Sequence, residues 1–252
     1  MSVLKNAADV LRLFASGQTE LTVSDVTTQL SIPKANASRL LKSMRDAGML
    51  ETIGATRRHR PGSLVLDVAS AFKHTSGLIR RATDVVAEVS ALYGHTGYVS
   101  LREGREVTGV ADFPGTNTLR VMGAVGRRLK AEQSATGRSL LARLRDAEVA
   151  ELYHGYEGLD DLLKRLAVVR QQGFSFSSQE ATPGVDAIAI SVANPAADEV
   201  VSLCIVYPHA VVADHDRNVM LSALAKGAAQ IAEELGDGAF VDPTAQQKGN
   251  FA

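Results

Sequence analysis

The sequence predicts an α+β protein with a helical N-terminal segment and a larger segment in which helices flank an antiparallel sheet. In the first 50 residues, apolar side chains recur three and four positions apart, which is the spacing of helices with one buried face. Beyond residue 95, short alternating runs are mixed irregularly with helical runs, and this order favours antiparallel strands. Residues 34–60 hold seven Lys and Arg against two Asp and Glu, which indicates a basic module.

The composition is that of a folded protein outside the membrane. The chain has 252 residues, 45% hydrophobic and 22% charged, enough for one large domain or two modest ones. Neither a secretory leader nor an apolar run of bilayer length is recognisable, so a cytoplasmic protein without a membrane partner is expected. The single cysteine, Cys204, rules out an intramolecular disulfide and a cysteine-rich metal site.

Three helices are predicted in the first 50 residues. The first covers residues 6–15, and the second begins near Thr22. A three-residue connection, 31–33, ends in a proline that can open a new helix. The third helix runs from about 34 to 47, and Gly48 suits the position just after its end. Two helices joined by so short a turn form a helix-turn-helix pattern.

The third helix separates a buried face from a polar one. Ala37, Leu40, Leu41 and Met44 fall on one side at about 100° per residue and are predicted to be buried. The opposite side is small, polar or basic, which suits a helix whose first turns enter a DNA major groove. The predicted DNA contacts on this helix are Lys34, Ala35, Asn36, Ser38, Arg39, Lys42 and Ser43.

A basic hairpin follows the third helix. Residues 49–53 suggest a strand and 54–60 a hairpin tip, the wing of a winged helix. Arg57, Arg58 and Arg60 are predicted to lie along the DNA backbone or minor groove. A solvated three-helix subdomain with a charged loop is the alternative, and the wing directly behind the helix argues against it.

The run PKANASRLLKSMRDAGMLE, with a short wing and then RPGSLVLDVASAF, resembles the DNA-binding half of IclR-type transcriptional regulators. The shared pattern is Pro-Lys before small polar residues, then Arg-Leu-Leu, and Gly before an aliphatic strand. Two positions depart from it. Ala35 stands where a serine is usual, which removes a phosphate-binding hydroxyl, and residues 59–62 differ from the usual aromatic-x-Leu-Gly wing exit.

Beyond residue 62, helices and strands are predicted along the rest of the chain. Residues 63–76 are expected to form a linker helix that also helps to pair two subunits. A helix at 78–93, a hairpin at 98–111 and an extended stretch at 118–122 follow. Further helices are predicted at 138–145, from 148, at 159–172 and at 216–235, with strands from 174, at 187–193 and at 200–207. Residues 239–252 have the composition of a flexible tail.

A second motif extends the resemblance to residues 4–236. QSATGRSLLARL, at 133–144, is similar to the signature of the GAF-like effector-binding domain of IclR-type proteins. The resemblance therefore implies a winged helix-turn-helix domain at 1–62, a linker at 63–76 and a GAF-like domain at 77–238. It also implies an effector pocket, and backbone N–H groups at 135–137 that could receive a carboxylate. The position of Ser177 often holds an acid in relatives, so a less polar wall is expected there.

Tyr98 is predicted to line this pocket because of its own position in the sequence. An inward tyrosine on the first strand of the sheet could stack on a ligand ring or form a hydrogen bond with it. The other pocket residues are implied by the resemblance. For each of them, ordinary core packing is the alternative. They are Leu119, Val121, Met122, Leu129, Ala135, Thr136, Ser177, Val185, Ala187, Cys204 and Val206.

No signature of catalysis, of a metal or of a cofactor is found. The six histidines lack metal-ligand spacing and are expected to be exposed or hydrogen-bonded. No Gly-x-Ser-x-Gly, Walker or dinucleotide motif occurs. Cys204 lies in an apolar run and is expected to be a small core residue rather than a nucleophile.

The sequence thus predicts a transcriptional regulator rather than an enzyme. It is expected to bind a near-palindromic operator in double-stranded DNA as a homodimer or homotetramer. The resemblance implies a small organic or aromatic acid of a catabolic pathway as its effector. Repression and activation both stay open. Two alternatives are an enzyme acting in the C-terminal pocket and a regulator whose C-terminal domain only oligomerises.

Overall fold

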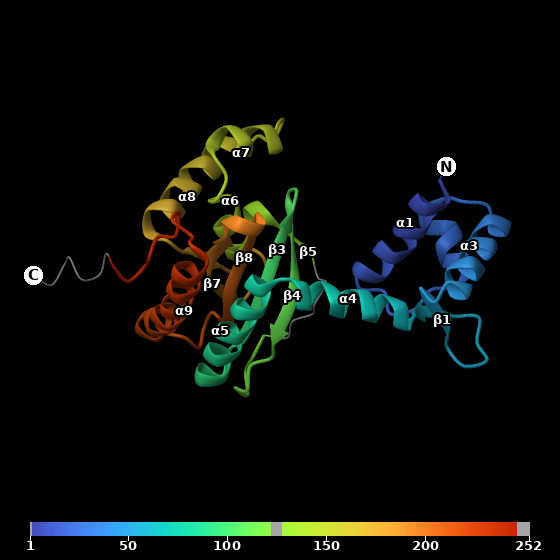
Figure 1. Cartoon of the computed structure of the whole chain (residues 1–252), viewed down its shortest axis with the longest axis horizontal. Helices are drawn as coiled ribbons and strands as arrows, with labels where there is room; N and C mark the ends of the chain where they lie inside the picture. Colours follow the sequence, from blue (N-terminus) through green and yellow to red (C-terminus); the bar gives the residue numbers. More distant parts are fainter. Residues whose placement is uncertain (1, 122–127, 246–252) are drawn as a thin grey trace, which may run out of the picture. The chain divides into compact units, whose positions relative to one another are not determined.

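The computed structural model describes residues 2–121 and 128–245. The chain divides into two compact units, Met1–Thr75 and Ser76–Ala252 (Figure 1). None of the described helices has the length and apolarity that crossing a bilayer requires.

The first unit contains the predicted helix-turn-helix and wing. Helices α1 (Val3–Ala15), α2 (Val23–Leu30) and α3 (Lys34–Asp46) are followed by the two-stranded sheet of β1 (Leu50–Thr52) and β2 (His59–Pro61). Helix α4 (Ser63–Thr75), the predicted linker, ends this unit. The core forms where the apolar faces of the first three helices meet, and its fully buried members include Val10, Leu21, Val26, Ala37 and Leu41.

Local capping sets the geometry between α2 and α3. The hydroxyl of Thr22 accepts a bond from the N–H of Asp25, whose carboxylate in turn accepts one from the N–H of Thr22. At the other end of α2, Ser31 has φ 53°, a left-handed conformation that turns the chain toward α3. Gly48 has φ 75° just after α3, as its position predicts.

The second unit is built on one six-stranded antiparallel sheet in the order β5-β4-β3-β8-β7-β6. Helices α5 (Gly77–Tyr93) and α9 (Asp214–Leu235) cover one face, and α6 (Ala135–Leu141) covers the other. Helix α8 (Leu159–Gln172) packs against α6, and α7 (Asp146–Leu152) against α8. The strands are β3 (Thr96–Glu103), β4 (Glu106–Phe113), β5 (Arg128–Lys130), β6 (Ser175–Ser178), β7 (Val185–Asn194) and β8 (Glu199–Pro208).

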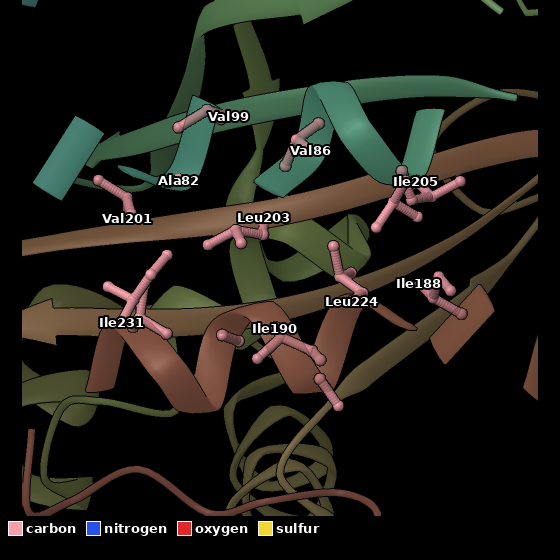
Figure 2. Close-up of a cluster of buried hydrophobic side chains, with 14 of the residues drawn as sticks. Ala82, Val86, Val99, Ile188, Ile190, Val201, Leu203, Ile205, Leu224 and Ile231 are labelled. Carbon is pink, nitrogen blue, oxygen red and sulfur yellow. The ribbon is translucent and has the colours of Figure 1, made fainter. Parts of the chain in front are cut away.

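The main core lies between the sheet and the α5–α9 pair. Figure 2 shows Val201, Leu203 and Ile205 of β8 pointing between the two helices. Their neighbours at 202, 204 and 206 point to the opposite face because side chains alternate along a strand. One face of β8 therefore belongs to the core, and the other is available to form a site beneath α6.

Strand β5 is not predicted from the sequence, and two other parts of the second unit differ from the prediction. Residues 118–121 form no strand, because Thr96 and Asn117 hold this stretch as a loop: the Thr96 hydroxyl donates to the Val121 carbonyl at 2.5 Å, and the Asn117 amide donates to Tyr93. The first part of the tail predicted from residue 239 is packed, and Pro243 is buried. Phe240 contacts the main core, and the Val241 backbone lies against Gly173.

Candidate DNA-binding surface and ligand cavity

Helix α3 presents the predicted two faces. Ala37, Leu40, Leu41 and Met44 are buried in the core of the first unit. The seven predicted DNA contacts, Lys34, Ala35, Asn36, Ser38, Arg39, Lys42 and Ser43, are all exposed. A helix buried on one side can present the other without changing its own packing.

Two of these exposed residues act as a pair. The Arg39 guanidinium donates to the Asn36 side-chain oxygen at 2.7 Å, one helical turn away. This bond leaves the Asn36 amide N–H groups and most of the guanidinium N–H groups available to another partner.

The three wing arginines differ in their surroundings. Arg58 forms an ion pair with Glu20, and Arg60 with Glu51 at 2.6 Å. No described residue pairs with Arg57, which is exposed at the hairpin tip. The Thr56 side chain holds this tip through bonds with Ile53 and Arg58. Arg57 is therefore the wing arginine that has no ion pair within the described chain to break before it binds an external anion.

Two histidines are buried, contrary to expectation. His59 and His95 are 6% and 7% exposed, and no described residue bonds to the Nδ1 of either. Burial lowers the pKa of His59, and the nearby charge of Arg45 lowers it further. Burial alone lowers the pKa of His95. Both imidazoles are thus held toward the neutral form.

A cavity of about 90 Å³, partly open to solvent, lies on the α6 face of the second unit's sheet. Its floor follows the alternation of the strands, with Tyr98 from β3, Cys204 and Val206 from β8, and Ala187 from β7. The start of α6 forms the opposite wall.

Most of the predicted pocket residues surround this one cavity. They are Tyr98, Val121, Leu129, Ala135, Thr136, Ser177, Val185, Ala187, Cys204 and Val206. Leu119 does not line it. Its side chain is 59% exposed, because the stretch expected to be a strand is a surface loop. Met122 lies outside the described residues.

The sequence interpretation missed six further lining residues, which are Ser100, Val107, Gly109, Ser134, Ala181 and Thr182. Ser100 lies two residues from Tyr98 on β3, so strand alternation could have identified it. Ala181 and Thr182 lie in the β6–β7 loop, where no periodic signal indicates which side chains turn inward.

The polar groups of the cavity are hydroxyls and one thiol. Ser100 and Ser177 are buried and line the cavity. Cys204 is 1% exposed. Burial raises the pKa of its thiol to about 11, against a smaller opposing effect of a hydrogen bond with Thr136. A thiol in this state is a poor nucleophile.

The start of α6 is fixed by two close contacts. The Ser134 hydroxyl accepts a bond from the Gly137 N–H at 3.0 Å, so this N–H is not available to a carboxylate. A Cβ at Gly137 would lie 2.2 Å from the Ala131 backbone, which explains the glycine of the Ala135–Gly137 motif. The N–H groups of Ala135 and Thr136 are the donors that remain.

The fold and these two sites define a class of protein, a winged helix-turn-helix module joined to a domain with a small-molecule cavity. The family model of the IclR helix-turn-helix domain matches residues 3–54, and that of the bacterial transcriptional regulator IclR C-terminal matches residues 71–233. The chain therefore belongs to the IclR family of transcriptional regulators, as the sequence motifs predict.

Individual relatives agree with this assignment. The HTH-type transcriptional regulator XynR of Escherichia coli K12 is 25% identical over 201 residues, which cover 76% of this chain and 80% of XynR. An IclR transcriptional regulator from Alicyclobacillus acidocaldarius shares the fold with a TM-score of 0.81 at 20% identity, over 92% of this chain and 97% of that one.

A second solved structure is an IclR homolog from Microbacterium hydrocarbonoxydans complexed with 4-hydroxybenzoate. It gives a TM-score of 0.77 at 19% identity, over 92% of this chain and 100% of that one. At these identities the two structures show a common fold.

Proposed function

We propose that the protein is an effector-responsive regulator that reads a near-palindromic operator through α3 and the wing. The observation that carries this proposal is the exposed face of α3, where Asn36 and Arg39 form a pair beside Lys42. An Arg side chain at the start of a recognition helix can bind guanine in the major groove, and lysines nearby can neutralise phosphates.

The effector proposed for the cavity is a small organic molecule, with aromatic monoacids as the first class to test. The floor offers apolar contacts from Val206 and Ala187, and Tyr98 supplies a ring beside them. A carboxylate could bind to the N–H groups of Ala135 and Thr136. The 4-hydroxybenzoate bound by a protein of the same fold supports the choice of class.

Sensing is favoured over catalysis by the residues around the cavity. In the described part of the chain, no histidine, aspartate or glutamate lines it, so its serines and its cysteine have no general base. The relatives named above are regulators.

The active form proposed is a homodimer or a homotetramer. Helices α1 and α4 expose apolar side chains, including Leu4, Leu66 and Val68. Exposed apolar groups on helix surfaces are typical of surfaces that pair with another subunit. A shift in the arrangement of the paired DNA-binding modules, transmitted along α4, would connect the effector to the operator.

Titration of the protein's own upstream DNA, with and without benzoate and 4-hydroxybenzoate, tests the proposal. Arg39→Ala is expected to weaken specific binding by about 1–3 kcal/mol, because a base contact is lost. Lys5→Ala, at an exposed site on α1, is the control and is expected to change little. If Arg39→Ala binds as tightly as the wild type, α3 is not the reading helix. If the wild type binds no DNA, the regulator itself is disproved.

A further inference from the structure

The β6–β7 loop, residues 179–184, forms one wall of the cavity. Ala181 and Thr182 line the cavity from this loop, and Val185 lines it from the first position of β7. The base of the hairpin is secured by a bond from the Ser178 hydroxyl to Asp186 at 2.9 Å. The loop therefore begins and ends at fixed points, and its middle covers the cavity.

Internal bonds make this loop a single body. The Gln179 side chain accepts a bond from the Gly184 N–H at 3.2 Å, and the Val185 N–H donates to the Thr182 carbonyl. Gln179 and Gly184 both have positive φ, at 57° and 76°. Changes of conformation at these two ends would move the loop as a unit.

Glu180 connects the loop to the helices around the cavity. Its carboxylate accepts two parallel bonds from Arg138 of α6, at 2.9 and 3.0 Å, and a third from Arg165 of α8 at 2.8 Å. The Arg138 side chain is 3% exposed, whereas Glu180 is 33% exposed. Carbonyl groups of Glu132 and Phe176 also hold Arg138, so the arginine is the fixed partner and Glu180 the movable one.

We propose that Glu180 is a positioning residue for effector binding: its carboxylate latches the β6–β7 loop onto α6 and α8, and release of this latch opens the cavity. The latch supplies a barrier to ligand entry and holds Ala181 and Thr182 in place once the ligand is bound. The role of the latch in effector binding rests on the proposed function, whereas the opening of the loop is a property of the fold.

The chain contains its own reporter of this opening. Cys204 is the single cysteine of the sequence, and it lies on the cavity floor with 1% of its surface exposed. Because this thiol is almost wholly buried even though the cavity is partly open, we expect its reaction with N-ethylmaleimide to become faster when the loop moves away, so the rate reports how often the loop opens. No DNA and no effector are needed.

The experiment compares alkylation of native wild-type protein and Glu180→Gln by intact mass at one fixed pH. Gln keeps the size of the side chain but leaves Arg138 without its counter-charge, so we expect alkylation to be faster by about tenfold or more. Glu234→Gln is the matched control. It breaks the comparable Arg81–Glu234 ion pair between α5 and α9, on the other face of the sheet, and should react at the wild-type rate.

Global unfolding is separated from loop opening by a core variant and by urea. Leu224→Ala opens a void in the main core, where Leu224 is fully buried, and lowers stability without touching the latch. We expect its alkylation rate in the absence of urea to stay near that of the wild type. The enhanced rate of Glu180→Gln should also be insensitive to low urea, because local opening exposes little surface.

A Glu180→Gln rate equal to that of the wild type would overturn the proposal, as would an equal acceleration in Leu224→Ala. If Glu180→Gln does not fold, Arg165→Met removes the exposed half of the latch and should still accelerate the reaction, by a smaller factor. Failure of DNA binding would disprove the regulator but would not alter these rates, so the two proposals fail separately.

Discussion

At the scale of single residues, the positive charge that the wing offers to DNA depends on which arginines are already paired, and not only on how many there are. Arg57, Arg58 and Arg60 look equivalent in the sequence, yet Glu20 and Glu51 already pair with two of them. Exposed ion pairs are weak, so DNA could still compete for these arginines, but breaking each pair reduces the net gain. Arg57 has no such ion pair to break when it binds DNA.

The wing arginines should therefore differ in the salt dependence of DNA binding. Arg57→Ala is expected to reduce the slope of log K against log [salt] by about 1, because one phosphate contact no longer releases its counterion. Arg60→Ala, at an arginine paired with Glu51, should reduce it less. Fluorescence anisotropy between low and physiological salt measures both slopes. Equal changes would show that the Glu51 pair does not persist in the complex.

Gly137 is a residue at which a single methyl group should be costly. A Cβ there would lie 2.2 Å from both the Cα and the carbonyl oxygen of Ala131, and backbone cannot yield as a side-chain end can. We expect Gly137→Ala to destabilise the protein by about 1–3 kcal/mol. Gly238→Ala is the control, since nothing lies within 4 Å of its Cβ position. Urea unfolding that gives the same midpoint for both variants would contradict this close packing.

At the scale of elements, β2 places an imidazole in the core of the winged helix. The backbone of His59 bonds to Leu21 in both directions, which joins the wing to the segment before α2. Its ring is buried, and both burial and Arg45 lower its pKa. Protonation of His59 would therefore oppose the packing of the wing against the helices.

The stability of the protein should fall at acidic pH through this residue. As pH falls through about 6.5, the unfolded state takes up a proton at His59 more readily than the folded state, whose pKa is lower, so unfolding becomes more favourable. We expect His59→Leu to show a smaller loss of Tm between pH 7.5 and 5.5, values about one unit either side of that pKa. His154→Leu, at an exposed histidine, should lose Tm as the wild type does. If His59→Leu loses as much Tm as the wild type, protonation of His59 is not the cause of the loss at acidic pH.

Elements with a clear period could be predicted from the sequence, and loops could not. The alternation along β8 places Cys204 and Val206 on one face, and the helical spacing of α3 separates Leu41 from Arg39. Loop side chains follow no period. The predicted strand containing Leu119 is a loop held by Thr96. Within the latch, Glu180 and Arg138 are 42 positions apart, a pairing that no local pattern encodes.

At the scale of the whole molecule, regulation requires that two sites share one equilibrium. If an effector changes the affinity for DNA by some factor, DNA must change the affinity for the effector by the same factor. The cavity and the face of α3 belong to different compact units, so each can be altered without touching the other. A variant at Glu180 should change effector binding while leaving effector-free DNA binding as it is.

The proposed pairing of two chains makes a prediction about the operator. Two α3 helices related by a twofold axis would read half-sites about one helical turn apart, which is about 10 base pairs. Inserting half a turn, about five base pairs, between the half-sites places them on opposite sides of the duplex and should reduce affinity at least tenfold. Inserting a full turn should restore part of it, because the half-sites again share one side. A gel-shift series over these spacings, with substitutions of equal number at unchanged length as controls, measures the effect. Affinity that ignores the half-turn insertion would mean that one α3 at a time binds the operator, and the twofold arrangement would be wrong.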